Sequence, residues 1–246
     1  MSLYREQGVV LRTYRLGEAD RIVVLMSESR GKVRAVVKGV RKTKSRFGAR
    51  LEPLSHVALM LYEGRNLDTV TQAEVLDHFR SVREDLDRFS KAQSVLEAVD
   101  SIAQEGQGNP RLYQMLVGAL RSLAAADSPL LVGAFFWKLL ALEGYRPLLD
   151  RCASCGAQDL EALAGFDPEM GGAICRTCRR GPTVVGVNAA SLALMRRVFG
   201  GGLADALREP ASAAVREVTG LATTALEHHL ERRMKSVSVG GAVSRT

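Results

Sequence analysis

Four cysteines are the residues whose type and spacing point most directly to chemistry. Cys152 and Cys155 form one C-x-x-C pair, Cys175 and Cys178 form a second, and nineteen residues separate the pairs. Each pair can present two thiolates from one tight turn, so the two pairs supply the ligands of a closed tetrahedral zinc site. A catalytic zinc needs an open position, and no histidine lies between residues 151 and 180. The spacing therefore predicts one structural Zn²⁺.

A second stretch, residues 30–50, is rich in positive charge: it holds nine lysines and arginines and no acidic residue. Its first part alternates apolar residues (Val33, Ala35, Val37) with cations, which predicts a strand with one buried and one cationic face, and a loop follows Gly39. Cations this close repel one another, and a polyanion relieves that repulsion. A solvated surface loop is the alternative. We predict that this stretch binds nucleic-acid phosphate through Arg30, Lys32, Arg34, Lys38, Arg41, Lys42, Lys44, Arg46 and Arg50.

Catalytic patterns are missing from the sequence. The glycines near residues 106 and 200 match neither a dinucleotide fingerprint nor a P-loop, because no Gly-Lys-Ser/Thr follows them. No Ser/His/Asp or Cys/His arrangement is present, and His228 and His229 fit a partly buried helical pair better than metal ligands. We therefore expect that the chain is not an enzyme and has no catalytic residues.

Composition and charge indicate a protein with one basic part. The net charge is +7, and residues 1–79 carry 14 basic against 9 acidic side chains. The first residues lack the apolar run of a signal peptide, and the longest apolar stretch, residues 130–137, is too short to span a bilayer. Paired cysteines without a secretory signal favour a metal in a reducing compartment. These features predict a cytoplasmic protein without a membrane segment.

The first 79 residues must position the basic stretch, and they read as short alternating strands. A turn signal joins the last two strands, and no helix of three turns interrupts the series. Five strands in so few residues favour a small closed barrel of the OB type, whose faces and loops often bind single strands, and an SH3-like barrel fits nearly as well. The expected strands are residues 8–15, 21–27, 32–38, 57–62 and 67–75.

After Phe79 the apolar period changes from two to about three and a half, which predicts helices. The helix expected over residues 129–143 is apolar on nearly every side, so we place it at the centre of a helical core with Phe135, Phe136 and Trp137. The residues after Lys235 are expected to be frayed. The predicted fold is multidomain α+β: an OB-type barrel at 1–79 and an all-helical domain at 80–246, with the four-cysteine zinc module at 150–182 inserted in it. The other helices are expected near residues 86–103, 112–123, 192–199 and beyond 210.

Several segments, in this order along the chain, resemble the bacterial RecO family of recombination-mediator DNA repair proteins. The similarity covers about the whole sequence and is clearest at residues 17–21, 31–42, 45–53, 142–147 and 229–236. It implies an OB-fold domain followed by a helical domain with an embedded zinc module. It also implies binding of single- and double-stranded DNA and annealing of complementary strands. The implied protein partners are RecR, the C-terminal tail of single-strand-binding protein and, indirectly, RecA.

Two other classes of function compete with this interpretation. The chain can be an RNA-binding OB and zinc protein of translation or RNA processing, which competition between RNA and DNA of equal length separates. It can also be a partner adaptor in which the helical domain does the work and the basic loop is incidental. Loss of function after neutralising only the loop would argue against this adaptor role. A metal-dependent nuclease is more remote and is tested by incubating DNA with Mg²⁺.

Overall fold

The computed structural model describes residues 2–40, 47–231 and 233–236. The chain divides into two compact units. Unit 1 comprises Met1–Asp127 together with Lys235–Thr246, and unit 2 comprises Ser128–Met234. Each unit is described by itself.

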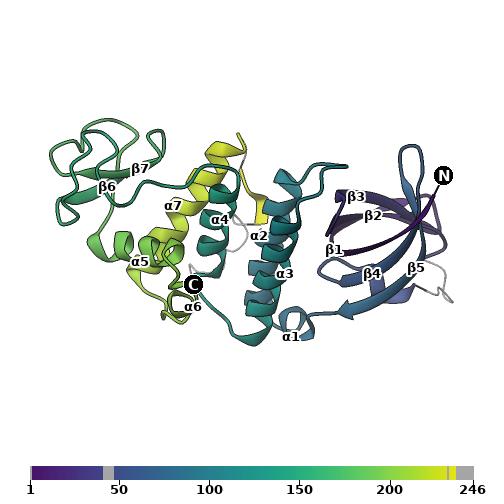
Figure 1. Cartoon of the computed structure of the whole chain (residues 1–246). Coiled ribbons are helices and arrows are strands. Elements are labelled where there is room, and N and C mark those ends of the chain that lie inside the picture. The colour runs from purple at the N-terminus through teal and green to yellow at the C-terminus, as the bar shows by residue number, and fades with distance from the viewer. Residues whose placement is uncertain (1, 41–46, 232, 237–246) are drawn as a thin grey trace. The chain divides into compact units, whose positions relative to one another are not determined.

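Unit 1 begins with a closed barrel of five strands (Figure 1). Neighbouring strands follow the order β1-β2-β3-β5-β4, and β1 pairs with β4 to close the circle. All pairs are antiparallel except β3 with β5, which joins Ala35 to Asp68 and Val36 to Thr69. The predicted OB-type barrel is confirmed. The strands are β1 (Leu3–Leu16), β2 (Asp20–Ser27), β3 (Gly31–Val37), β4 (His56–Tyr62) and β5 (Asp68–Asp77).

Strand β1 is longer than the sequence predicts because it serves two neighbours. Its first half pairs with β4 and its second half pairs with β2, with a bulge between Val10 and Arg12. In β3 the predicted alternation is confirmed: Val33, Ala35 and Val37 are buried in the barrel core, and the residues between them are not. A 3-10 turn (Gly48–Leu51) follows the basic loop and contributes buried Leu51 to the same core.

Three helices of unit 1 follow the barrel: α1 (Arg80–Arg83), α2 (Leu86–Ile102) and α3 (Pro110–Ala125). Asp85 caps α2 through the Arg88 N–H, and Asn109 caps α3 with proline at the first helical position. The residues after α2 pair with β3, since the Lys32 N–H donates to the Gln104 carbonyl at 2.9 Å. A Cβ on Gly31 (φ +69°) would lie 2.0 Å from the Gln107 carbonyl oxygen, so this close approach requires glycine.

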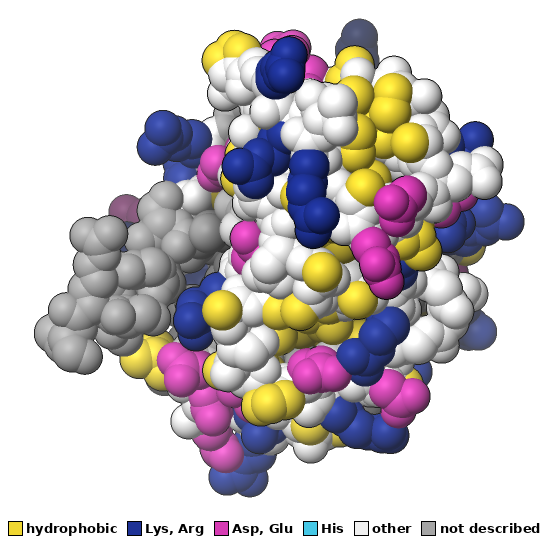
Figure 2. Space-filling model, turned by 90° about the vertical axis from the view of Figure 1, so that its left-hand side faces the viewer, with side chains coloured by type: hydrophobic (Ala, Val, Ile, Leu, Met, Phe, Trp, Pro, Cys, Tyr) yellow, Lys and Arg dark blue, Asp and Glu magenta, His cyan; other side chains and the backbone are white. Residues whose placement is uncertain are grey.

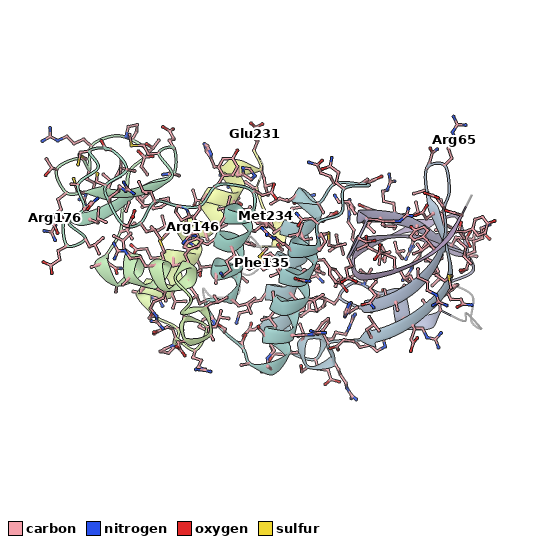
Figure 3. The ribbon with its side chains drawn as sticks, viewed as in Figure 1. Arg65, Phe135, Arg146, Arg176, Glu231 and Met234 are labelled. Carbon is pink, nitrogen blue, oxygen red and sulfur yellow. The ribbon has the colours of Figure 1, made fainter. Side chains whose placement is uncertain are left out.

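Unit 2 is built around α4 (Leu131–Leu142), which is buried on most sides as predicted, with Phe135, Phe136 and Trp137 in the core. It packs on α7 (Ala213–His229), where the Trp137 indole N–H donates to the Val218 carbonyl at 3.2 Å. Two further helices are α5 (Ala189–Phe199) and α6 (Leu203–Ala206). Phe135 is labelled on α4 in Figure 3.

Some sequence-based expectations differ from the structure. Helix α4 begins at Leu131, because Pro129 belongs to the preceding turn. Unit 2 also contains a small sheet that strand periodicity did not reveal: β6 (Leu163–Asp167), β7 (Gly172–Cys175) and β8 (Val185–Gly186). The expected partly buried histidine pair holds for His229, which is half-buried, but not for His228, which is exposed. Most of the tail expected to fray, residues 237–246, lies outside the described residues. Among the described helices, none is long and apolar enough to cross a membrane.

Candidate metal centre and nucleic-acid interface

The four predicted metal ligands come together in unit 2. One ligand atom from each of Cys152, Cys155, Cys175 and Cys178 lies within 4.8 Å of all the others. The first pair precedes β6, Cys175 is the last residue of β7, and Cys178 follows one turn later. The Sγ atoms of Cys155 and Cys175 are 3.9 Å apart. The separation of nineteen residues is therefore bridged by the β6–β7 hairpin, which returns the second pair to the first.

Tight backbone turns hold each pair. The Gly156 N–H donates to the Cys152 carbonyl at 2.9 Å, and the Cys178 N–H donates to the Cys175 carbonyl at 3.1 Å. Gly156 has φ +76°, a conformation that glycine adopts without strain. The Cys175 N–H also donates to the Cys152 sulfur at 3.3 Å, which links the two turns. This arrangement is the two-knuckle geometry of a four-thiolate metal centre.

The electrostatics of the four thiols suit a cation. Burial raises the pKa of Cys152, but N–H groups of Cys155, Cys175 and Ser154 outweigh it and lower the pKa to about 6. Its thiolate is thus favoured near neutral pH. Hydrogen bonding with Cys175 and Cys155, together with burial, raises the pKa of Cys178 to about 12, so this thiol keeps its proton in the absence of a cation. A divalent cation removes that obstacle, so the donor set fits a thiophilic metal ion.

The arginines beside the second knuckle do not form one cationic surface. Arg179 lies across the small sheet and donates to the Ala164 carbonyl at 3.4 Å. A Cβ on Gly165 or Gly186 would come within 3.3 Å of its side chain, so these glycines leave room for it. Arg176 points away from the module in Figure 3. On the face shown in Figure 2, basic, acidic and hydrophobic side chains are interspersed.

The predicted phosphate-binding residues lie on β3 and the segment after it, in unit 1. Of the nine, Arg41, Lys42, Lys44 and Arg46 lie outside the described residues. Lys38 and Arg50 are exposed at the two ends of that segment. Arg30, Lys32 and Arg34 belong to β3 or the turn before it. The structure therefore describes five of the nine cations.

The three cations of the β3 region have acidic partners that are distant in sequence. Arg30 pairs with Glu63 at 3.3 Å and lies over the Tyr4 ring, 3.8 Å from its centroid. Lys32 pairs with Asp100 at 3.3 Å and donates to the Asp100 carbonyl, and only 15% of its side chain is exposed. These contacts commit part of the local positive charge to the fold.

Arg34 and a residue that the sequence analysis missed, Arg12, lie in one cross-strand row on the outer surface of the barrel. Arg34 lies 3.6 Å from Glu105, and Arg12 lies 2.8 Å from Asp100, with 43% and 47% of their side chains exposed. Arg12 pairs in register with Val24, which pairs with Arg34. The sequence carries no alternation signal for it, since Arg12 follows the consecutive buried residues Val9–Leu11 and a bulge.

Two apolar pockets lie within unit 2. One, of about 240 Å³, is lined by Trp137, Leu140, Tyr145 and Phe166 among others, and the Tyr145 and His229 rings lie 4.3 Å apart beside it. The other, of about 270 Å³, lies between Phe166 and helix α7.

The fold and site together define an OB-barrel protein with a second unit in which four clustered cysteines could hold a metal ion. The family model for Recombination protein O N terminal matches residues 1–79, and that for Recombination protein O C terminal matches residues 83–238. The chain is 43% identical over 242 residues to the DNA repair protein RecO of Nocardioides sp. (strain ATCC BAA-499 / JS614), covering 96% of this chain and 98% of that protein. It is 41% identical over 241 residues to the DNA repair protein RecO of Frankia casuarinae, with the same coverage. The chain belongs to the RecO family of DNA repair proteins.

Proposed function

We propose that the chain is a recombination mediator that binds single- and double-stranded DNA without sequence preference and anneals complementary strands. With RecR, it would help to load RecA onto DNA coated with single-strand-binding protein. The observation that carries the proposal is that the two family models and the two relatives together match this chain along nearly its entire length. The cation-rich stretch at residues 30–50 supports the proposal, because its positive charges attract the phosphates of DNA.

The mechanism is charge neutralisation, with no covalent step. Lysines and arginines of residues 30–50 replace counterions on phosphate, which gives affinity without base readout. Two strands held on one cationic surface repel each other less, so their bases can pair. Arg30, Lys32 and Arg34 also have carboxylate partners in the fold, and the same stretch continues with Lys38, Arg41, Lys42, Lys44, Arg46 and Arg50.

We assign the metal of the cysteine centre as Zn²⁺. Four thiolates in two C-x-x-C turns suit zinc, and a fully protein-ligated zinc is structural. It would be held by Cys152, Cys155, Cys175 and Cys178, whose ligand atoms already converge. In zinc-finger peptides such binding contributes roughly 10–16 kcal/mol at pH 7, enough to order a module with a three-stranded sheet and little core.

The division of labour follows the proposed domains. The barrel at residues 1–79 binds DNA, and the helical domain at 80–246, with the zinc module at 150–182, receives the acidic, hydrophobic-ended tail of single-strand-binding protein and RecR. Apolar pockets such as those of unit 2 suit a tail of that kind. A nucleoid-associated place in the cytoplasm is part of this proposal.

A salt-dependent binding and annealing assay tests the proposal. Two complementary labelled strands are mixed with and without the protein at several salt concentrations. The proposal requires that the protein accelerate annealing of any complementary pair, and that binding weaken steeply with salt. Binding that prefers RNA of equal length, or one sequence only, would overturn it.

A further inference from the structure

Strands β1, β2 and β3 present an outward face that is made of cross-strand rows. In one row Arg12 pairs with Val24 and Val24 pairs with Arg34. In the next row Tyr14 pairs with Ile22, and Ile22 pairs with Val36. Because directly paired residues in antiparallel strands project to the same side, each row lies on one surface.

Helix α2 and the residues after it cover one end of this face, within the same unit (Figure 1). At that end Met26, which pairs with Lys32, is fully buried, and Lys32 reaches Asp100. Exposure rises along the face: Val24 is still buried, whereas Ile22 and Val36 are half-buried and Tyr14 is 43% exposed. The covering helix therefore stops between the arginine row and the tyrosine row.

The Tyr14 ring is held by its neighbour in the arginine row. The guanidinium carbon of Arg12 lies 5.0 Å from the ring centroid, and Arg12 is itself fixed by Asp100 at 2.8 Å. An aromatic ring anchored in this way has few orientations to lose when a ligand packs on it. The ring stands beside two apolar side chains, with a cation from Arg12 and another from Arg34 on the adjacent row.

We propose that Tyr14 is a base-stacking residue for single-stranded DNA, with Arg12 and Arg34 contacting the phosphates that flank the stacked base. The proposal rests on the proposed function and adds to it a contact to a base. Aromatic side chains next to a cationic groove are how proteins bind single strands without sequence preference, because every base has a π-face. The contact thus keeps binding independent of sequence while favouring unpaired over paired strands.

The carboxylates beside the arginines do not oppose this role. Asp100 and Glu105 pair with side chains that remain 47% and 43% exposed. A guanidinium has five N–H donors, so the exposed parts of Arg12 and Arg34 can donate to a phosphate while each carboxylate stays in place. Arg12, Lys32 and Arg34 also outnumber the two carboxylates, which leaves a net positive charge at the row.

Two single-stranded DNA probes of equal charge distinguish base stacking from phosphate binding. One is a labelled oligothymidylate of about 15 nucleotides, and the other is a labelled abasic strand of the same length. Fluorescence anisotropy of the full-length protein measures both affinities. We expect the wild type to prefer the base-carrying strand by about tenfold. Tyr14→Ala and Tyr14→Leu should abolish the preference and keep the affinity for the abasic strand, and Tyr14→Phe should keep both. The Leu variant retains apolar packing, so a loss of the preference in this variant reports the missing aromatic ring.

The matched control is Tyr62→Ala, because Tyr62 on β4 is also 43% exposed but lies outside the β1–β3 face. It should keep the preference. The salt slope of the Tyr14 variants should equal that of the wild type, since no charge is removed. A preference that survives in Tyr14→Leu, or a wild type that binds both strands equally, would overturn this inference alone. A wild type that binds neither strand would overturn the proposed function and this inference with it.

Discussion

The imidazole Nε2 of His56 lies 2.7 Å from the Tyr113 hydroxyl oxygen. His56 is the first residue of β4 and Tyr113 belongs to α3, so the contact joins the barrel to the helices that follow it within unit 1. Both side chains are buried, and their rings lie 5.9 Å apart. The Tyr113 hydroxyl can donate to an unprotonated Nε2 or accept from a protonated one, so the protonation state of His56 sets the direction of this hydrogen bond.

The stability of unit 1 should fall when His56 is forced to take a proton. Burial lowers the pKa of His56, the positive charge of Arg121 adds to that effect, and Asp77 opposes it. The unfolded chain, with a histidine pKa of about 6.5, therefore binds the proton more readily than the folded one. The contribution of neutral His56 to the free energy of unfolding is therefore complete above about pH 6.5, and it is lost as the pH falls through the folded-state pKa of His56. Denaturant unfolding at about pH 7.5 and about pH 5.5 should show a smaller loss in His56→Gln than in the wild type. Equal losses would contradict the assignment.

Asp100 should be a structural carboxylate, because it pairs with both Arg12 and Lys32. Asp100→Ala leaves the largely buried Lys32 ammonium without its carboxylate, which should destabilise unit 1 by about 2 kcal/mol. Glu105→Ala is the matched control on the same face, because Glu105 is 55% exposed and its pair with Arg34 is longer. It should change the unfolding free energy much less. Equal effects of the two substitutions in denaturant titrations would show that burial of Lys32 is unimportant.

The metal centre should contain about one zinc per chain in protein purified without chelator. Cys152→Ser combined with Cys155→Ser should lower the melting temperature of unit 2 while DNA binding by the barrel is retained. Arg176→Ala is the control, because Arg176 follows a ligand directly but is exposed. Elemental analysis and thermal unfolding measure both effects. A metal-free protein with wild-type thermal stability would refute a structural metal.

The basic loop should supply most of the DNA affinity through phosphate contacts. If about six cations each displace a counterion, a plot of the logarithm of the binding constant for a single DNA strand against the logarithm of the salt concentration should have a slope of about −4, at roughly −0.7 per contact. The variant Lys38→Ala, Arg41→Ala, Lys42→Ala, Lys44→Ala should weaken binding to all sequences alike, flatten the slope by roughly 3 units and slow annealing. Its melting temperature should barely change, because substitution of solvated charged side chains usually alters stability little.

A charge-matched control separates the loop from net charge. Replacing the exposed Arg65, Arg80, Arg111 and Arg208 with alanine removes the same four charges elsewhere. That variant should keep most of the wild-type slope. If both variants flatten the slope equally, the loop is not a specific phosphate-binding segment.

The tail of single-strand-binding protein should bind outside the basic loop. A fluorescent peptide with that acidic, hydrophobic-ended sequence should bind the loop variant about as well as the wild type, because its apolar end needs a pocket and not a phosphate site. Removing the terminal hydrophobic residue of the peptide should abolish binding. Loss of peptide binding in the loop variant would move the partner site to the barrel.

The sequence predicted features that depend on local pattern. Alternation in residues 32–38 predicted β3, the all-round apolar stretch predicted the central position of α4, and the paired cysteines predicted a metal cluster. It did not predict that Lys32 and Arg34 pair with Asp100 and Glu105, since those partners lie more than sixty positions away and carry no local signal. The absence of acidic residues within 30–50 therefore overstated the free charge. Short elements such as β8 were missed because two residues hold no period.

The parallel seam between β3 and β5 consists of only two residue pairs, Ala35 with Asp68 and Val36 with Thr69. Closing it requires β3 and β5, which are separated by residues 38–67, to meet. Its loop-closure entropy is therefore larger than that of the three hairpins β1–β2, β2–β3 and β4–β5. We infer that the seam forms late in folding and opens first under stress. An opened barrel presents two unpaired strand edges, which are templates for pairing with another copy. The aggregation resistance of this unit therefore depends on the shortest ladder in its sheet.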